Sequence, residues 1–169
     1  EGELRPQLLD RFGMSVEVRT VRDPELRVQV VDQRTAFDGD PDGFNTAVEA
    51  NQNALQQRVV EAQQLLDQVS IDDDLRLQIS AVCGELDVDG LRGDIVTNRA
   101  ARALAAFEGR TEVTEEDIAR VASCCLRHRL RKDPLEQVDS GERVVKVFCK
   151  VFERSESSDR SDFELALAA

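Results

Sequence analysis

The sequence predicts a mainly α-helical fold, in which one short helix and one β-strand precede a helical bundle. Apolar residues recur at a helical period through most of the chain. One stretch near the N-terminus instead alternates between apolar and polar residues, as a strand does. Charged residues make up 33% of the chain and Trp and Tyr are absent, which is typical of helices with solvated faces, while 41% hydrophobic residues can support a core.

The first segment predicts a short helix that leads into the strand. In Leu4–Gly13 (LRPQLLDRFG), Pro6 suits a first helical turn and Gly13 ends the helix. Met14–Val21 alternates and is predicted to be a strand. Because one strand cannot form a sheet alone, its neighbours must come from sequence that is missing here or from another molecule. Three side chains of the short helix are expected to be buried: Leu8, Leu9 and Phe12.

Two helices are predicted between residues 23 and 68, separated by an acidic turn. Asp23 is the expected N-cap of the first, with Pro24 at its first position. The turn Asp38–Gly43 does not place its carboxylates in the register of an EF-hand, and the cysteines lack metal-ligand spacing, so no metal site is predicted. The second helix runs from about Phe44 to Gln68. The expected buried positions are Leu26, Val30 and Phe37, then Val48, Leu55, Val59, Ala62, Leu66 and Val69.

A helix that opens at Ile71-Asp72 begins the bundle, and two later helices complete it after the central stretch described next. Thr114 and Asp117 resemble a capping box, weakened because Asp is shorter than Glu. The last helix is expected from about Gly141 to Phe152, and residues 153–169 are predicted to be a disordered tail. The expected inward positions are Leu75, Ile79, Val82, Cys83, Leu86, Ile118, Val121, Ala122, Cys125, Val144, Phe148, Val151 and Phe152.

The central stretch, Leu86–Ile118, places an arginine at the start of a helix. Gly90 and Gly93 flank Leu91-Arg92, where they free the backbone to turn and leave room for a close approach. At a helix N-terminus the backbone N–H groups and the dipole favour an anion beside Arg92, although a surface arginine in a loop is the simpler interpretation. Gly109 is expected to end this helix. Its predicted inward residues are Val96, Ala100, Ala103, Leu104 and Phe107.

The cationic run Arg127–Lys132 follows the next helix. Cations in a last turn complement the helix dipole, and we weigh this role against the binding of an anion or a partner. His128, the single histidine, is interpreted as part of this cationic end rather than as a catalyst.

Composition and motifs exclude several classes of function. A net charge of −12 argues against nucleic-acid binding. The sequence shows no signal peptide, transit peptide or membrane-spanning run, and no membrane insertion is expected. It begins Glu-Gly-Glu, so we expect a piece of a longer polypeptide. No catalytic dyad is evident, and without a G-x-x-x-x-G-K-S/T loop the chain cannot cradle a triphosphate by itself.

Several separate runs agree, in order, with one family. Leu4–Gly13 is followed by a strand and by a bundle that carries Gly90–Asp94 (GLRGD), within Glu85–Arg99, and Leu126–Leu135 agrees as well. With these runs the chain, from about Glu1 to Phe152, resembles the C-terminal part of the ATPase subunit of magnesium chelatase, an AAA+ protein. The resemblance implies three regions. Residues 1–22 would end the α/β core of the AAA+ domain, 23–152 would be the helical lid with its long helical connection, and 153–169 would be the tail.

The resemblance also implies roles for two arginines. Arg11, in Leu-Leu-Asp-Arg-Phe, corresponds to the arginine finger, and Arg92, in Gly-Leu-Arg-Gly, to the second sensor. A guanidinium is always charged and can bind two phosphate oxygens at once, so an arginine suits both of these roles. Arg11 would act in trans on a neighbouring subunit's ATP, while ATP and Mg²⁺ would be bound mainly by residues absent from this chain.

The family's reaction is the insertion of Mg²⁺ into protoporphyrin IX, which leads to chlorophyll and serves photosynthesis. By resemblance this protein would be the motor of that ligase. It would form a homo-oligomeric, hexameric ring and work with two further chelatase subunits, a second AAA+ protein and the large porphyrin-binding protein. The chloroplast stroma is the implied location, with cyanobacterial cytoplasm as the alternative.

The resemblance finally implies a redox role for Cys83 and Cys125, with thioredoxin as a candidate partner. These two positions match those associated with redox regulation in plastid members, and Cys124 and Cys149 are the expected bystanders. The simpler interpretation is two buried, reduced thiols on the apolar faces of bundle helices.

Two other classes stay open at this point. A helical interaction module without a nucleotide role would explain the bundle and the acidic surface, but not Arg92 between two glycines. The lid region of another AAA+ ATPase, such as a MoxR-type chaperone or a helicase, would carry similar arginines. A helicase would be expected to show basic loops for DNA, whereas this chain is strongly acidic.

Overall fold

The structure is a computed structural model that describes residues 6–18, 20–130 and 140–152. In these ranges β pairing is limited to one isolated bridge between Ser70 and Glu112. The prediction of a mainly helical fold is therefore confirmed. The helices, with η for 3₁₀, are α1 (Pro6–Leu9), α2 (Pro24–Gly39), α3 (Pro41–Leu65), η1 (Leu66–Gln68), α4 (Asp73–Glu85), α5 (Arg92–Phe107), α6 (Glu115–Leu126), η2 (Arg127–Arg129) and α7 (Ser140–Val151).

By packing, the chain divides into two units. The first comprises Glu1–Val16 with Ala62–Ala169, and the second comprises Glu17–Glu61. The domain boundaries that the sequence suggested, after residues 22 and 152, stay a prediction, and the proposed tail 153–169 lies outside the described residues. No helix in the described ranges is both long enough and apolar enough to cross a membrane.

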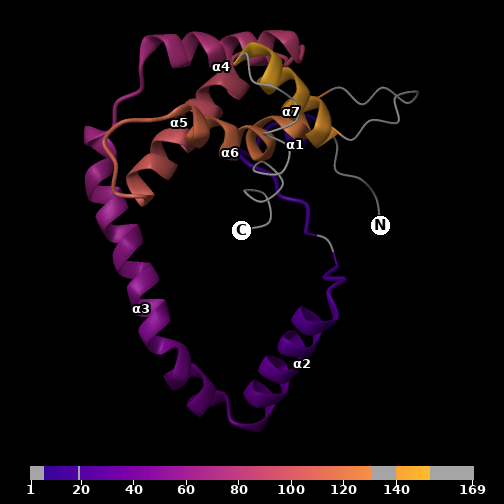
Figure 1. The fold of residues 1–169 in the computed structure, drawn as a ribbon, viewed down its shortest axis with the longest axis vertical. Helices are drawn as coiled ribbons and strands as arrows, with labels where there is room; N and C mark the ends of the chain where they lie inside the picture. The colour runs from indigo at the N-terminus through magenta and orange to yellow at the C-terminus, as the bar shows by residue number, and fades with distance from the viewer. Residues whose placement is uncertain (1–5, 19, 131–139, 153–169) are drawn as a thin grey trace. The chain divides into compact units, whose positions relative to one another are not determined.

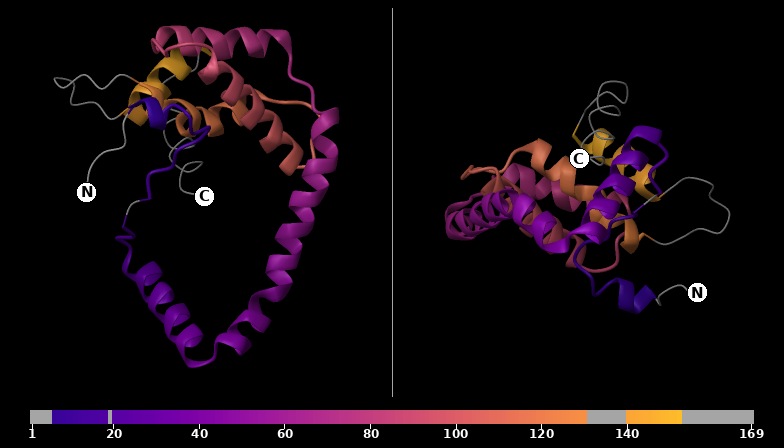
Figure 2. Two further views of the ribbon diagram at one scale, coloured as in Figure 1. Left: turned by 180° about the vertical axis from the view of Figure 1, so that it is seen from behind. Right: turned by 90° about the horizontal axis from the view of Figure 1, so that it is seen from below.

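The core of the first unit lies among α4, α5, α6 and α7, which gather into one bundle (Figure 1). Most of the residues predicted to face inward from α4, α6 and α7 are buried there, whereas Leu75 and Val151 are only partly buried. The segment that follows α1 also belongs to this unit and lies against the ends of α5 and α6 (Figure 2). The largest fully buried side chains are Phe148, Ile79, Leu86, Ile118 and Leu126.

Helix α5 turns a different face to the core from the one predicted. Its buried residues are Gly93, Thr97, Ala101, Ala105 and Ala106. The larger apolar side chains that the sequence suggested are at most partly buried, and Ala103 is exposed. Residues four apart share one face of a helix, and a face of small residues lets α5 approach its neighbours closely. The large apolar side chains that the sequence analysis selected therefore lie at the edge of the buried face of α5, and the small residues lie at its centre.

Local capping explains where the bundle helices begin and end. Gly109 has a φ of 74°, the left-handed conformation that ends α5 as predicted. Thr114 is the N-cap of α6, and its box with Asp117 is complete. The Asp117 carboxylate accepts from the backbone N–H of Thr114 at 2.8 Å and from both terminal nitrogens of Arg110, at 2.8 and 2.5 Å. The shorter aspartate thus caps α6 with help from an arginine of the preceding turn.

In the second unit, α2 begins as predicted but does not bury its predicted face. Asp23 caps α2 through the backbone N–H groups of Glu25 and Leu26, and Pro24 is its first residue. No residue of α2 or α3 is buried, and Leu26 and Val30 are exposed. Phe37 instead packs edge-on against Phe44, with ring centroids 5.8 Å apart, across the short break between the helices.

The apolar positions predicted along the second helix divide into two groups. Leu55 and Val59, within the second unit, are exposed. Ala62 and Leu66, at the end that belongs to the first unit, pack against the core, and Val69 is buried in it. Arg102 of α5 holds this end by donating to the carbonyls of Val69 and Leu66, at 3.0 and 3.2 Å.

The predicted strand Met14–Val21 is not a strand in the described residues. The segment is irregular, and Met14, Val16 and Val18 are exposed. A backbone hydrogen bond ties it to the bundle, from the N–H of Ser15 to the carbonyl of Cys124, at 2.8 Å. Because a strand requires a hydrogen-bonded neighbour, the alternating pattern alone cannot produce one here.

Candidate functional site

Arg11 lies on a tight turn that follows α1. The N–H of Arg11 donates to the carbonyl of Leu8 at 3.1 Å, and the N–H of Phe12 to that of Leu9 at 3.0 Å. Arg11 is exposed. The expectation that Leu8 and Phe12 are buried is wrong in this structure, since both are about half exposed and only Leu9 is partly covered. Two hydrogen-bonded turns, rather than apolar burial, shape this segment.

Arg129 of η2, whose side chain is buried, binds the backbone of this turn. The side chain of Arg129 is only 2% exposed. Its Nη1 donates to the backbone carbonyl of Asp10 at 2.8 Å and also contacts the Asp10 carboxylate. Its Nη2 donates to the carbonyls of Phe12 and Gly13, at 2.6 and 3.4 Å. Its Nε donates to the carbonyl of Cys125 at 3.0 Å, so the same guanidinium also serves the C-terminal end of α6.

His128 adds another contact to this turn. Its Nε2 lies 3.1 Å from the carbonyl of Phe12, which can only accept, so Nε2 carries the proton. Burial lowers the pKa of His128, and the hydrogen bond to Phe12 and the nearby Asp10 carboxylate only partly offset this effect. The imidazole is therefore neutral near pH 7 and is not the cationic cap that the sequence suggested.

Arg92 is the first residue of α5, as predicted. Its Nη1 donates to the backbone carbonyl of Asp10 at 3.0 Å and lies 3.4 Å from the Asp10 carboxylate. The Arg92 side chain is 49% exposed, and Leu91 before it supplies no side-chain cap. A carboxylate thus pairs with the guanidinium at a helix start whose N–H groups lack a side-chain cap. This donor set fits an anionic group such as a phosphate.

The two glycines beside Arg92 have separate tasks. Gly90 has a φ of 72°, so it provides the turn into α5. Gly93 lies within the first turn of α5, where an added Cβ would come within 3.0 Å of Val88 and 3.1 Å of Leu126. Side chains of the bundle therefore pack closely against Gly93, and this packing fixes the position of the first turn of α5, where Arg92 lies.

The structure brings the two predicted arginines into one neighbourhood. Arg92 binds Asp10, which immediately precedes Arg11 in the chain. The Asp10 carboxylate contacts both Arg92 and Arg129. The role of Arg129 was missed. The cationic run at the end of α6 pointed to its position, but the dipole interpretation gave no reason to look for contacts with the N-terminal turn.

All four cysteines are free thiols in the structure, and Cys83 and Cys125 are buried in the bundle. Burial raises the pKa of each of these two thiols to about 12, and the Asp94 carboxylate adds to the effect at Cys83. The Cys125 thiol also contributes to the raised pKa of Cys83. As they stand, both are protonated and poorly nucleophilic at neutral pH.

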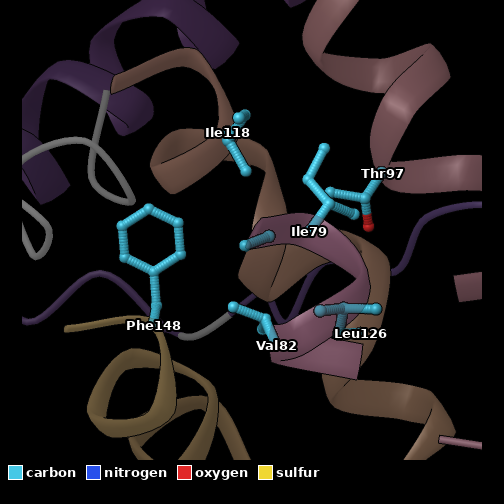
Figure 3. A pocket seen from close by; sticks show the side chains of 7 residues that line it. Ile79, Val82, Thr97, Ile118, Leu126 and Phe148 are labelled. Atoms are coloured by element: carbon cyan, nitrogen blue, oxygen red, sulfur yellow. The ribbon is translucent and has the colours of Figure 1, made fainter. Parts of the chain in front are cut away.

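A small hollow lies inside the core of the bundle. Seven residues line it, among them Thr97, Ile118 and Phe148, whose side chains converge in Figure 3. The hollow is too narrow to hold a water molecule, and its lining is almost wholly apolar. It is a packing gap of the core and offers no room for a ligand.

The bundle belongs to a recognised class of domain. Residues 76–147 match the AAA lid domain family. A crystal structure of a protein from Cytophaga hutchinsonii, described as an ATPase, aligns with 88% of this chain and 48% of that chain at a TM-score of 0.64. Its sequence identity of 20% supports the fold alone. The fold is therefore that of an AAA lid.

Three relatives are much more similar to this chain in sequence. The magnesium-chelatase subunit ChlI of Synechocystis sp. is 68% identical over 152 residues, which are 90% of this chain and 43% of that protein. The ChlI subunits of Porphyra purpurea and Chlamydomonas reinhardtii, the latter chloroplastic, are 64% and 62% identical over 92% and 90% of the chain. Over about nine tenths of its length, this chain is therefore similar to part of the magnesium-chelatase ChlI subunits. It spans less than half the length of these relatives, 44% and 36% for the last two.

Proposed function

We propose that this chain is part of the ATPase motor subunit of magnesium chelatase, which couples ATP hydrolysis to the insertion of Mg²⁺ into protoporphyrin IX for chlorophyll synthesis. The observation that carries the proposal is the 68% identity to a ChlI subunit over 90% of the chain. The AAA lid class of residues 76–147 supports the ATPase part. By itself the chain should hydrolyse no ATP, because it has no Walker A loop.

In this proposal Arg92 is the second sensor. Its exposed guanidinium at the start of α5 already pairs with the Asp10 carboxylate, so its surroundings tolerate a negative charge. ATP would supply a phosphate that competes for the same donors, with Mg²⁺ and most phosphate contacts provided by parts of the subunit outside this chain. Arg92 belongs to the bundle, so its contact with a phosphate would link nucleotide state to lid position.

Arg11 is the arginine finger and acts in trans. It is exposed on a turn whose backbone is held on both sides, which supports a rigid, outward-pointing cation. A finger arginine in other phosphoryl-transfer systems contributes roughly 10³–10⁵ in rate because it stabilises charge on the transferring group. Such a contribution requires preorganised placement.

The remaining parts of the proposal rest on the similarity to ChlI subunits. The protein would form a homo-oligomeric ring, most simply a hexamer, and would act with the second AAA+ protein and the porphyrin-binding protein of the chelatase. Since one relative is chloroplastic and another is cyanobacterial, we place the protein in the chloroplast stroma or the cyanobacterial cytoplasm.

A mixing experiment with the full-length subunit that carries this sequence tests the finger. Arg11→Ala subunits should still bind ATP and enter rings but should hydrolyse ATP poorly. A second variant without the Walker lysine keeps its own finger. Mixed rings should recover part of the hydrolysis at interfaces that join an intact finger to an intact phosphate loop.

Four results would each contradict a part of this proposal. No recovery in rings shown to be mixed would contradict action in trans, and full hydrolysis by Arg11→Ala alone would overturn the finger. If the wild-type protein hydrolysed ATP but did not support Mg²⁺ insertion with the other two chelatase proteins, the result would favour the MoxR-type chaperone alternative. If the full-length protein did not bind ATP, the interaction module would be favoured instead.

We also propose that Cys83 and Cys125 can form a regulatory disulfide. Both cysteines belong to the buried core of the same bundle, which supports the pairing, and their burial predicts slow formation. Exchange with oxidised thioredoxin would join the two sulfurs and reduce the thioredoxin disulfide to two thiols. Mass spectrometry of the oxidised full-length subunit should find the Cys83–Cys125 crosslink, with Cys124 and Cys149 free. Oxidation without this crosslink would contradict the pairing.

A further inference from the structure

We propose that Arg129 is a positioning residue for Arg11: it fastens the turn that carries Arg11 to the end of α6, so that this turn moves with the lid. The inference rests on the proposed function of Arg11 and adds a residue to it. Arg129 is itself too buried to reach a nucleotide, at 2% exposure, so it acts through the turn.

The contacts of Arg129 bracket Arg11 in the chain. One terminal nitrogen holds the carbonyl of Asp10, which belongs to the peptide group that joins Asp10 to Arg11. The other terminal nitrogen holds the carbonyl of Phe12, one residue beyond Arg11. With the backbone fixed before and after it, Arg11 keeps its direction while its own side chain stays exposed.

Arg129 also contacts the bundle, and we call its contacts with the turn and with α6 together the clamp. The Nε of Arg129 donates to the carbonyl of Cys125 in the last turn of α6, and η2 continues that helix. The neighbouring carbonyl, that of Cys124, accepts from the N–H of Ser15, so the chain is also tied after the turn. A displacement of α6 would therefore carry the Asp10–Gly13 backbone with it.

Only an arginine provides this set of donors. Its planar fork presents Nε and two terminal nitrogens in fixed directions, and here each of the three meets a different backbone oxygen. A lysine has one nitrogen on a flexible stem and cannot serve Asp10, Phe12 and Cys125 together. The Asp10 carboxylate also forms ion pairs with Arg129 and Arg92, but these pairs do not require the planar donor geometry of a guanidinium.

The test uses the full-length subunit with Arg129→Lys, which keeps the cation, and Arg129→Met, which keeps only the length of the stem. Arg76→Met is the matched control, because Arg76 forms a local ion pair with the exposed Asp73 at the start of α4. Both Arg129 variants should bind ATP within a few-fold of wild type and enter rings. Their hydrolysis should fall about 10- to 100-fold, since a displacement of ~1 Å at a catalytic group can cost that much.

Two readouts separate positioning from a general loss of structure. In mixed rings the Arg129 variants should behave as finger-defective subunits: the Walker-lysine variant should rescue them and Arg11→Ala should not. Hydrogen exchange at the backbone N–H groups of Arg11 and Phe12, which close the turn, should speed up in the Arg129 variants and stay unchanged in Arg76→Met.

The outcomes are distinct for the clamp and for the finger. Arg129 variants that hydrolyse ATP normally beside an impaired Arg11→Ala would overturn the clamp and leave the finger intact. Loss of ATP binding by both Arg129 variants, or no rescue by the Walker-lysine variant, would make Arg129 a structural residue and overturn the inference. If Arg11→Ala hydrolysed normally, the finger would fail, and unchanged exchange at Arg11 and Phe12 would then overturn the clamp as well.

Discussion

The bundle of α4–α7 and the helices α2 and α3 both contain apolar residues at helical spacing, but they differ in what those residues contact. In the bundle, Phe148 and its neighbours are fully buried, and Phe148 stacks on Phe152 with ring centroids 4.1 Å apart. In α2 and α3 no residue is buried, and Val30 and Val31 are 58% and 62% exposed.

The difference separates what forms a helix from what buries it. Caps and helical spacing lie within a few residues of one another, so they act in both regions: Asp23 caps α2 and Thr114 caps α6. Burial depends on a second apolar surface, which the bundle finds in its own helices. Most helical stability in proteins comes from such packing. The bundle should therefore respond strongly to side-chain changes, and α2 weakly.

The largest contrast is expected between Phe148→Ala and Val30→Ala. Removing a fully buried ring leaves a cavity, so Phe148→Ala should lower the free energy of unfolding by about 3–5 kcal/mol. Val30→Ala should change it by less than about 0.5 kcal/mol, as for other exposed positions. Denaturant unfolding followed by circular dichroism measures both. A loss of several kcal/mol for Val30→Ala would mean that α2 is covered in solution and would remove the contrast.

A second contrast concerns two carboxylates that pair with arginines. Asp117 is 1% exposed and satisfies Arg110 and the start of α6, so Asp117→Asn should cost about 2–4 kcal/mol. Asp38 pairs with Arg34 on exposed α2, where Asp38→Asn should cost at most about 1 kcal/mol. Equal losses in the same unfolding experiment would show that burial does not set the strength of these pairs.

The same aspartate predicts a pH dependence. Burial opposes the charge on Asp117, but the hydrogen bonds from Arg110 and Thr114 outweigh it and hold the pKa of Asp117 below its usual value. Because the folded pKa is the lower one, its stabilisation is complete above the unfolded pKa of about 4 and is lost as the pH falls further. Below about pH 4 wild type should lose stability more steeply than Asp117→Asn. Parallel curves for the two proteins would contradict this assignment.

The smallest contrast lies between two helical glycines of the bundle. An added Cβ at Gly84 in α4 meets nothing within 4 Å, so Gly84→Ala should stabilise by up to about 1 kcal/mol. At Gly93 the Cβ would press on Val88 and Leu126, so Gly93→Ala should be less stable than Gly84→Ala by about 1–3 kcal/mol. If both substitutions stabilised equally, Gly93 would not fix the start of α5.

The sequence was most informative where the determinant is local. The capping box at Thr114, the end of α5 at Gly109 and the position of Arg92 at a helix start are all confirmed. Each depends on residues within a few positions of one another, which hydrogen-bonding and backbone rules cover.

It was least informative where distant segments meet. The buried face of α5 is built on Gly93, Thr97 and Ala101, whose small size matters only once a neighbouring helix is in place. The alternation in Met14–Val21 predicted a strand that has no neighbour in the described residues. The contact of Arg129 with Asp10 joins positions 119 residues apart, and no spacing rule connects them.

In the proposed function, Arg92 contacts the nucleotide and links it to the lid. Hydrogen exchange in the full-length subunit, with and without a non-hydrolysable ATP analogue, tests this most directly at residues 86–99. In wild type the analogue should slow exchange there, and in Arg92→Ala this response should be lost while the exchange of the α6 and α7 core stays slow. Arg92→Ala should also weaken ATP-dependent Mg²⁺ insertion. An unchanged response to the analogue, with hydrolysis and Mg²⁺ insertion at wild-type levels, would contradict the account.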